Sequence, residues 1–297
     1  MKKVAVIRDL LIPVLFICFF TGVVHAEARV AAFVSIIPQA YFLERVGGPH
    51  VDVEVLVGEG QSPATYEPSP QQMAKLSSTK AYFAIGVPFE KNLIKKIRQS
   101  YKKLVIVETQ KGVAYRYLEH HSHDHDAKGG RDHHDRVPDP HIWMDPKLVK
   151  VQATNIRDAL CELDPANAED YSKNLRLFIS DLDQADKRIR AALAPVRGKS
   201  MYVFHPAFGY FADSYGLRQV SIEIEGKEPG AKQLATIIDK AKKEGVRVIF
   251  VQPQFSMKSA ESVAREIGGA VVPINPLARD YLANLERMAA SVEKGLR

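Results

Sequence analysis

The sequence predicts an α/β protein with two lobes, each built on a mostly parallel four-stranded sheet, joined by one long helix. Three observations support this fold class: short β-rich runs alternate with helical patterns, the alternation occurs twice, and a long helical segment separates the two occurrences. At 297 residues, 46% hydrophobic and 26% charged, the chain is long enough for two domains of ordinary size. A cleft between the lobes is the expected place for a ligand.

Residues 27–145 are expected to form the first lobe, in which strands and helices alternate. The expected strands are Arg29–Ser35, Val51–Val57, Ala81–Ile85 and Leu104–Val107. The expected helices are Gln39–Val46, Pro70–Leu76 and Glu90–Gln99.

Residues 146–198 are expected to form helices that connect the lobes. Asp145 is a favourable N-cap, and Pro146 suits the first helical position. Asp164 and Pro165 repeat this start signal, and apolar residues then follow at helical spacing almost to Gly198. A helix of this length can join two lobes as a semi-rigid strut.

Residues 199–297 are expected to form the second lobe, because the alternation resumes after Gly198. The expected strands are Met201–Phe204, Gln219–Ile224, Val246–Val251 and Ala270–Ile274. The expected helices are Ala231–Glu244, Lys258–Ile267 and Tyr281–Lys294.

Residues 1–26 are typical of a secretory signal peptide. Three basic residues precede an apolar run, and small residues around Ala26 suit cleavage. The apolar run is shorter than the roughly 18–20 residues needed to span a membrane. Bulky Ile17 before Cys18 disfavours the alternative of a lipid anchor at that cysteine. We therefore expect an exported, periplasmic protein.

The composition of the remaining chain excludes some classes of partner. Without residues 1–26 the formal charge falls from +6 to +4, and basic residues do not cluster with aromatic ones, so nucleic acid is not an expected partner. Cys161 is then the only cysteine. An internal disulfide is therefore excluded, and a buried apolar role is expected for this side chain.

Seven of the ten histidines lie within residues 119–146. Residues 118–138 lack apolar periodicity and combine His, Asp, Ser and Gly, so we expect a mobile loop there. Its histidines are expected to form accessory low-affinity metal sites that raise the local metal concentration, and a solvated linker is the alternative. They are His120, His121, His123, His125, His133 and His134.

Two histidines outside this loop are candidate metal ligands. His141 lies in "PDPHIWMDP", where prolines restrict the backbone and Trp143 offers an apolar anchor. His205 follows the apolar run "MYVF", at the carboxyl end of an expected strand. The two belong to opposite lobes, so one metal ion can bridge them across a cleft. A structural histidine is the alternative for each.

A carboxylate is the expected complement, because neutral imidazoles leave the charge of a divalent ion unbalanced. Asp280 follows the last expected strand and precedes the last helix, where a helix N-cap is the alternative role. Glu225 and Glu228, in "EIEGKEPG", are weaker candidates.

At several segments the chain resembles the cluster A-I substrate-binding proteins of zinc and manganese ABC transporters, the ZnuA-like family. The segments are "YEPSPQQMAKL", "IGVPFEK", "DPHIWMDP", "FHPAFGYFADSYGL" and "EIEGKEPGAKQL", in the family's order and over nearly the whole chain after residue 26. The resemblance implies a metal between two lobes, with His141, His205 and Asp280 as ligands. It also implies delivery of the metal, by a monomer, to an inner-membrane permease with its cytoplasmic ATPase.

One family ligand is missing. The first family histidine corresponds to Ala64 in "SPATYEP", and alanine cannot bind a metal. An open position or the amide oxygen of Gln61 is the favoured replacement, and Glu67, a water or a loop histidine are further alternatives. Two imidazoles and a carboxylate suit Zn(II), which the histidine-rich loop also favours, with Mn(II) or Fe(II) as the alternative cargo.

Two other function classes compete with metal transport. A zinc-dependent hydrolase also uses three protein ligands and a water, but would need a base such as Glu67 or Glu225 beside that water. The chain has no His-Glu-x-x-His helix, Gly-x-Ser-x-Gly elbow or phosphate-binding glycine loop. A surface adhesin fits export but explains neither the two histidines nor the loop. We therefore expect no enzyme activity.

Overall fold

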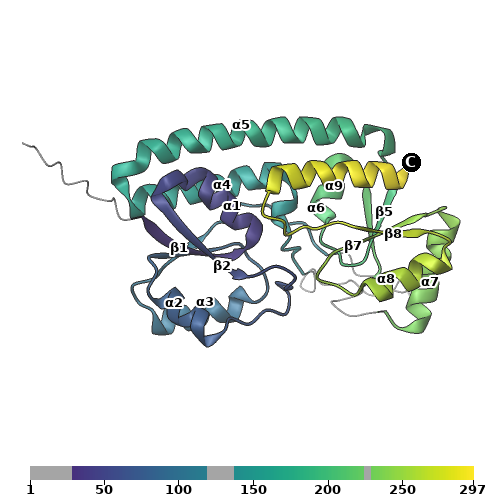
Figure 1. Ribbon diagram of the computed structural model, residues 1–297, viewed down its shortest axis with the longest axis horizontal. Helices are drawn as coiled ribbons and strands as arrows, with labels where there is room; N and C mark the ends of the chain where they lie inside the picture. Colours follow the sequence, from purple (N-terminus) through teal and green to yellow (C-terminus); the bar gives the residue numbers. More distant parts are fainter. Residues whose placement is uncertain (1–28, 119–136, 224–228) are drawn as a thin grey trace, which may run out of the picture.

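The structure is a computed structural model that describes residues 29–118, 137–223 and 229–297. The expected signal peptide and the six loop histidines lie outside the described residues, as do Glu225 and Glu228. Figure 1 shows two lobes side by side beneath one long helix, α5.

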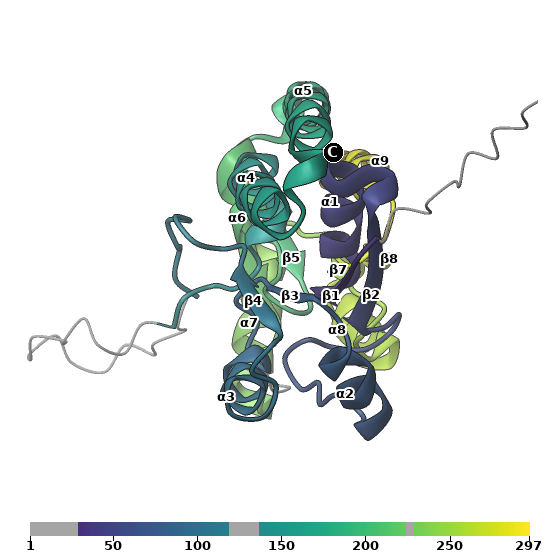
Figure 2. The same cartoon turned by 90° about the vertical axis from the view of Figure 1, so that its left-hand side faces the viewer.

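The first lobe contains a four-stranded sheet in the order β2-β1-β3-β4, in which all neighbours are parallel. Its strands are β1 (Val30–Ile36), β2 (Val51–Val57), β3 (Ala81–Ala84) and β4 (Val105–Glu108), and its helices are α1 (Ile37–Gly47), α2 (Pro70–Ser77) and α3 (Glu90–Ser100). Ser69 and Gln72 form a reciprocal capping box at the start of α2. Figure 2 shows α1 on one side of the sheet and α2 and α3 on the other.

The connecting segment forms α4 (Pro146–Leu163) and α5 (Ala168–Leu193). The side chain of Asp145 accepts a hydrogen bond from the N–H of Lys147 at 2.8 Å, so the expected N-cap is confirmed. The second helix begins later than expected. Asp164 Oδ2 accepts from Asn167 Nδ2 and from the Tyr171 hydroxyl, and the chain forms a 3-10 turn at Pro165–Asn167 before α5 starts.

The second lobe repeats the strand order of the first. Its sheet runs β6-β5-β7-β8, again with parallel neighbours. The strands are β5 (Ser200–Val203), β6 (Arg218–Ser221), β7 (Val248–Val251) and β8 (Ala270–Pro273), and the helices are α6 (Gly209–Tyr215), α7 (Ala231–Lys243), α8 (Met257–Glu266) and α9 (Tyr281–Leu296). The sequence did not predict α6, because most of its residues are buried and it lacks a polar face.

The core joins the two lobes. One cluster of buried side chains extends from the first sheet through α4 and α5 to α6 and α9, and a second cluster packs the second sheet against α7 and α8. Trp143 Nε1 donates to the carbonyl of Pro276 at 2.9 Å, and the Tyr281 hydroxyl donates to the carbonyl of Trp143 at 2.6 Å. The two-lobe fold class is therefore confirmed, while the exact domain boundaries stay a prediction.

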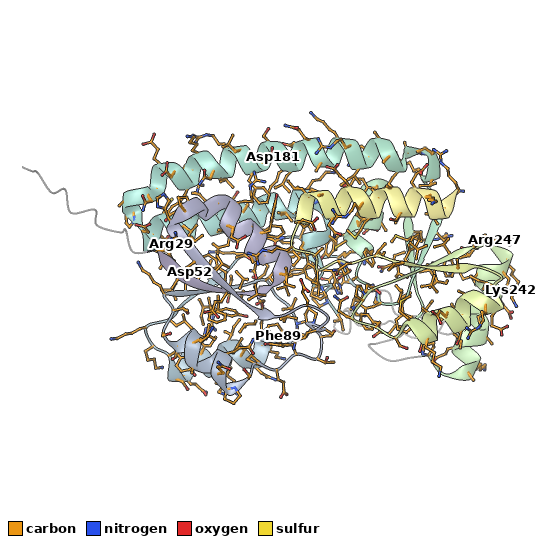
Figure 3. The ribbon with its side chains drawn as sticks, viewed as in Figure 1. Arg29, Asp52, Phe89, Asp181, Lys242 and Arg247 are labelled. Atoms are coloured by element: carbon orange, nitrogen blue, oxygen red, sulfur yellow. The ribbon has the colours of Figure 1, made fainter. Side chains whose placement is uncertain are left out.

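The labelled charged side chains lie at the outside of the molecule. Figure 3 shows Asp181 on the outer helix α5, and Lys242 and Arg247 at the outer end of the second lobe.

Within the described residues, none of the helices is both long enough and apolar enough to cross a membrane.

Candidate metal site

A cavity of about 740 Å³ lies where the carboxyl ends of strands from both lobes meet. Its walls include residues 62–64 after β2, 86–88 after β3, 205–207 after β5, 221 and 223 at the end of β6, and 252, 254 and 255 after β7. In open parallel sheets, ligands bind outside the carboxyl ends of the strands where the strand order reverses. Each sheet here has such a point, beside β1 and beside β5.

His141 and His205 meet in this cavity, as the sequence led us to expect. Their Nε2 atoms are 3.4 Å apart, and their ring centroids 5.3 Å apart. His141 precedes a 3-10 turn at Ile142–Met144, whose residues are buried and anchor it. His205 follows β5, and the Gln252 amide holds its backbone by accepting from its N–H at 3.2 Å and donating to its carbonyl at 2.7 Å.

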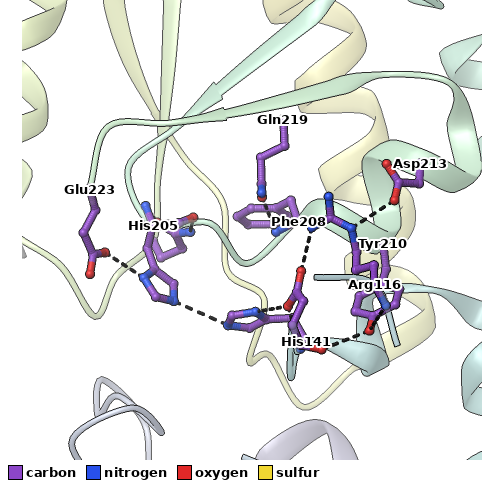
Figure 4. Close-up of polar contacts among 10 residues, drawn as sticks. Arg116, His141, His205, Phe208, Tyr210, Asp213, Gln219 and Glu223 are labelled. Carbon is purple, nitrogen blue, oxygen red and sulfur yellow. Dashed lines mark hydrogen bonds and ion pairs between the residues drawn. The ribbon is translucent and has the colours of Figure 1, made fainter. Parts of the chain in front are cut away.

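A buried carboxylate holds each imidazole by its other nitrogen (Figure 4). His141 Nδ1 lies 2.7 Å from Asp139 Oδ1, and His205 Nδ1 lies 2.6 Å from Glu223 Oε2. Because an ionised carboxylate only accepts hydrogen bonds, each neutral ring carries its proton on Nδ1. The two Nε2 atoms then carry lone pairs, and their separation of 3.4 Å allows both to bind one cation.

Asp139 is itself held by groups from both lobes. Arg116 Nη1 donates to Asp139 Oδ2 at 2.7 Å, and Arg116 Nε donates to Asp213 of α6 at 3.0 Å. The Tyr210 hydroxyl donates to the Asp139 carbonyl at 2.9 Å and accepts from the Arg116 N–H at 3.0 Å. A Cβ at position 209 would lie 1.7 Å from Arg116 Nη1, so any side chain there would displace the guanidinium from its present position.

This network determines the charge state of Asp139. Burial acts to raise the pKa of its carboxyl, but the hydrogen bonds and charge of His141 and the bond from Arg116 outweigh burial and lower the pKa. Burial also raises the pKa of the neighbouring Tyr210 hydroxyl to about 12. Asp139 is therefore ionised and Tyr210 neutral near pH 7.

His205 is kept neutral by its surroundings. Burial lowers the pKa of its imidazole, and the hydrogen bond that the ring donates to Glu223, which acts to raise the pKa, only partly offsets this. The ring also stacks on Phe255, with centroids 4.6 Å apart and planes at 18°. Neutral imidazole is the form that binds metal ions.

The structure does not bring the other two predicted ligands to the histidine pair. Asp280 is exposed at the start of α9, where its Oδ2 pairs with Arg287 at 2.6 Å, and its side chain does not cap the helix. Gln61 is exposed, and its Oε1 accepts from the Gly58 N–H at 2.8 Å. Neither residue lines the cavity. Their assignment as ligands stays a prediction, and we take only His141 and His205 further.

The sequence reasoning missed both carboxylates that hold the imidazoles. Asp139 stands two residues before His141 in "DPHIWMDP", and Glu223 stands two residues before Glu225 in "EIEGKEPG". Strand periodicity was the available signal for Glu223. Side chains two residues apart on a strand share a face, and Ser221, at the end of β6, also lines the cavity.

The described residues supply fewer than three metal donors at this place. Across residues 29–118, 137–223 and 229–297 there is no group of three or more His, Cys, Asp or Glu side chains arranged to hold a metal ion. Ala64, at the position of the missing family histidine, lines the cavity with a methyl group.

Comparisons with known proteins agree with the fold and with the sequence motifs. The family described as "Zinc-uptake complex component A periplasmic" matches residues 33–295 of the chain. The chain belongs to this family. The resemblance inferred from the sequence motifs is thereby confirmed.

The alignments with individual relatives extend over most of this chain. A protein of Yersinia pestis named "High-affinity zinc uptake system protein ZnuA" is 31% identical over 84% of each chain. "Zinc-binding protein AdcA" of Streptococcus pyogenes is 31% identical over 93% of this chain but 56% of its own length, so the chain spans about half of that relative. A solved structure titled "Crystal structure of ZnuA" is 38% identical, with a TM-score of 0.83 over 91% of this chain and 100% of that one.

Proposed function

We propose that this protein captures Zn(II) outside the cytoplasm and delivers it to an ABC permease in the inner membrane. The observation that carries the proposal is the pair of Nε2 atoms 3.4 Å apart, each oriented by a carboxylate at Nδ1. Membership of a zinc-uptake family and the zinc-binding names of the relatives support it. Export is supported by the expected signal peptide and by the word "periplasmic" in the family description.

The separation of the two nitrogens is compatible with a tetrahedral zinc ion between them. Zinc–nitrogen bonds of about 2.0–2.1 Å at a tetrahedral angle place the two nitrogens about 3.3–3.4 Å apart. The observed 3.4 Å fits the tetrahedral case.

No observation favours the zinc hydrolase. Among the described residues of the cavity wall, Glu223 is the one carboxylate, and its Oε2 is engaged by His205 Nδ1. A hydrolase needs a carboxylate placed to accept a proton from the metal-bound water. We therefore infer that metal capture, without catalysis, is the role of this site.

Zinc titration of single-histidine variants tests the proposal. The background is the chain from residue 27 with residues 119–136 replaced by a short glycine linker, which removes the loop histidines. The two ends can be joined, because Leu118 N donates to the Val137 carbonyl at 3.0 Å. His141→Ala and His205→Ala are each expected to weaken zinc binding by more than about 100-fold.

His50→Ala is the matched control for the loss of one histidine. His50 pairs with Asp170 at 3.1 Å and does not line the cavity, so zinc affinity is expected to be unchanged. Stoichiometric zinc in both His141→Ala and His205→Ala would rule out the site.

The accessory role of the histidine-rich loop stays a proposal of its own. The full chain from residue 27 is expected to bind more zinc ions than the loop-deleted form, the extra ones weakly. Equal stoichiometry and affinity in the two proteins would leave the loop as a linker.

A further inference from the structure

Two short segments, 116–118 and 137–139, pair as antiparallel strands beside the cavity. The Asp139 N–H donates to the Arg116 carbonyl at 2.9 Å. In a regular antiparallel pair, two facing residues exchange two such bonds, so the Arg116 N–H would donate to the Asp139 carbonyl. Here the hydroxyl of Tyr210 takes the place of that second bond, because it accepts from the N–H at 3.0 Å and donates to the carbonyl at 2.9 Å. A side chain of the second lobe is therefore built into a backbone ladder of the first.

Asp139 links this hydroxyl to a metal-binding histidine. Its Oδ1 accepts from the His141 N–H at 3.0 Å and lies 2.7 Å from His141 Nδ1. Because a hydrogen bond weakens steeply as its length and angle depart from their preferred values, a shift of Asp139 loosens the hold on the ring. Tyr210 follows His205 closely in the chain. One segment of the second lobe thus carries one histidine of the pair and holds the support of the other, as Figure 4 shows.

The hydroxyl is the stronger of two polar contacts that α6 makes with these segments. Tyr210 is only 6% exposed, and Asp139 is fully buried. Without the hydroxyl, the Asp139 carbonyl either loses this donor in a buried place or moves to meet the Arg116 N–H directly, and both outcomes weaken the hold on Asp139. The other contact joins Arg116 to Asp213, whose side chain is 62% exposed. Exposed ion pairs contribute little.

We propose that Tyr210 is a positioning residue through which the second lobe controls the release of zinc. The inference rests on the proposed function, because it concerns the same histidine pair. While α6 is in place, the hydroxyl keeps Asp139 where it orients His141 toward His205. When α6 moves away, the hydroxyl leaves the ladder and His141 loses its fixed orientation. A permease that binds the protein better with α6 displaced would thereby promote release without contacting the metal.

Transfer of zinc to an excess of a chromophoric chelator, followed by stopped flow, tests the inference. The protein is the full chain from residue 27, loaded with one zinc ion per molecule. Tyr210→Phe removes the hydroxyl and keeps the ring. It is expected to speed zinc dissociation at least about tenfold and to leave the association rate within about twofold, because the hydroxyl acts on a bound state already formed.

Tyr171→Phe is the matched control for the loss of a buried hydroxyl. The Tyr171 hydroxyl donates to Asp164 at 2.6 Å, and the side chain does not line the cavity. Both rates are expected to stay unchanged in this variant, while urea unfolding shows a lower free energy of unfolding. The same behaviour in Tyr210→Phe, with lower stability and unchanged dissociation, would overturn the inference and leave zinc capture intact.

Nitrogen NMR of the imidazoles in the metal-free proteins tests the positioning without zinc. The signals of His141 are assigned by comparison with His141→Ala. In Tyr210→Phe the share of His141 rings that carry the proton on Nδ1 is expected to fall, while the His205 signals stay unchanged. Unchanged His141 signals would overturn the inference. Failure of the unmodified chain to bind zinc would overturn the proposed function, whereas these signals would still report whether Tyr210 positions His141.

Discussion

The two histidines of the cavity are held in different ways. Asp139, which orients His141, is part of an ionic network that includes Arg116 and reaches Asp213 in the second lobe. Glu223, which orients His205, is not paired with an arginine among the residues that the structure describes, and the ring also stacks on Phe255. The first half of the site thus depends on charges that are paired across the lobes. The second half combines the Glu223 carboxylate with packing on Phe255 and the neutral amide of Gln252.

The loops behind the cavity show the same contrast. After β3, the buried carboxyl of Glu90 accepts from the N–H groups of Ile85 and Gly86, at 2.9 and 2.6 Å, and so holds one cavity wall. After β7, the neutral amide of Gln252 holds the backbone of His205. One lobe therefore uses an ionisable group where the other uses an amide. Changes of pH should affect the first lobe more strongly than the second.

The largest expected effect is a pH dependence of stability that comes from Glu90. Burial raises the pKa of this carboxyl from 4.5 to about 7, against the opposing hydrogen bonds from Ser35, Ile85 and Gly86. Because the folded-state pKa is raised, the stabilisation is fully present below pH 4.5 and is lost as the pH rises through about 7. The loss is on the order of 3 kcal/mol.

Urea unfolding of the metal-free chain from residue 27, at pH 5 and pH 8, measures this effect. Glu90→Gln is the control, because an amide resembles the protonated carboxyl and cannot ionise. The free energy of unfolding of the unmodified protein should fall relative to that of Glu90→Gln between the two pH values. Parallel pH profiles would show that Glu90 is not the responsible group.

The next largest effect compares the two orienting carboxylates. Asp139→Asn replaces the anionic acceptor of His141 with a neutral amide and removes the charge partner of Arg116, so zinc affinity is expected to fall about 100-fold. Glu223→Gln makes one orienting acceptor neutral without breaking a pair with arginine, and a fall of about 10-fold is expected. Competition with a chromophoric chelator measures both. An equal or larger loss for Glu223→Gln would contradict the proposed difference between the lobes.

Asp213→Asn is the control for the ionic network. Asp213 is an exposed partner of Arg116, and exposed ion pairs contribute about 0–1 kcal/mol. Zinc affinity is therefore expected to stay within about twofold of that of the unmodified protein.

The smallest expected effect concerns the stacking of Phe255 on His205 in the second lobe. Phe255→Leu keeps an apolar side chain but removes the stack on His205, which is worth about 0.5–1.5 kcal/mol. Zinc affinity is expected to fall by a few-fold, as measured by the same competition assay. Unchanged affinity would mean that Glu223 and Gln252 alone hold the ring.

Much of the fold follows from local sequence patterns. The eight strands expected from β-rich runs lie within about two residues of their observed positions wherever the structure describes them, since each run is bounded by turn residues or a helix start. The cap at Asp145 also follows from the sequence, because capping involves neighbours in the chain. Helix α6 does not, because a helix buried on nearly all sides lacks the periodicity that identifies one.

The sequence by itself determined the two parallel sheets, the long connecting helix and the two histidines that meet between the lobes. These depend on periodicity, on turn and capping residues, and on strands whose carboxyl ends face one cleft. Only the tertiary structure decided that Asp139 and Glu223 orient the imidazoles, that Arg116 joins this site to α6, and that Asp280 pairs with Arg287 outside the cavity. The physical reason is that hydrogen-bond partners are selected by distance and burial in three dimensions, and separation along the chain does not reveal either.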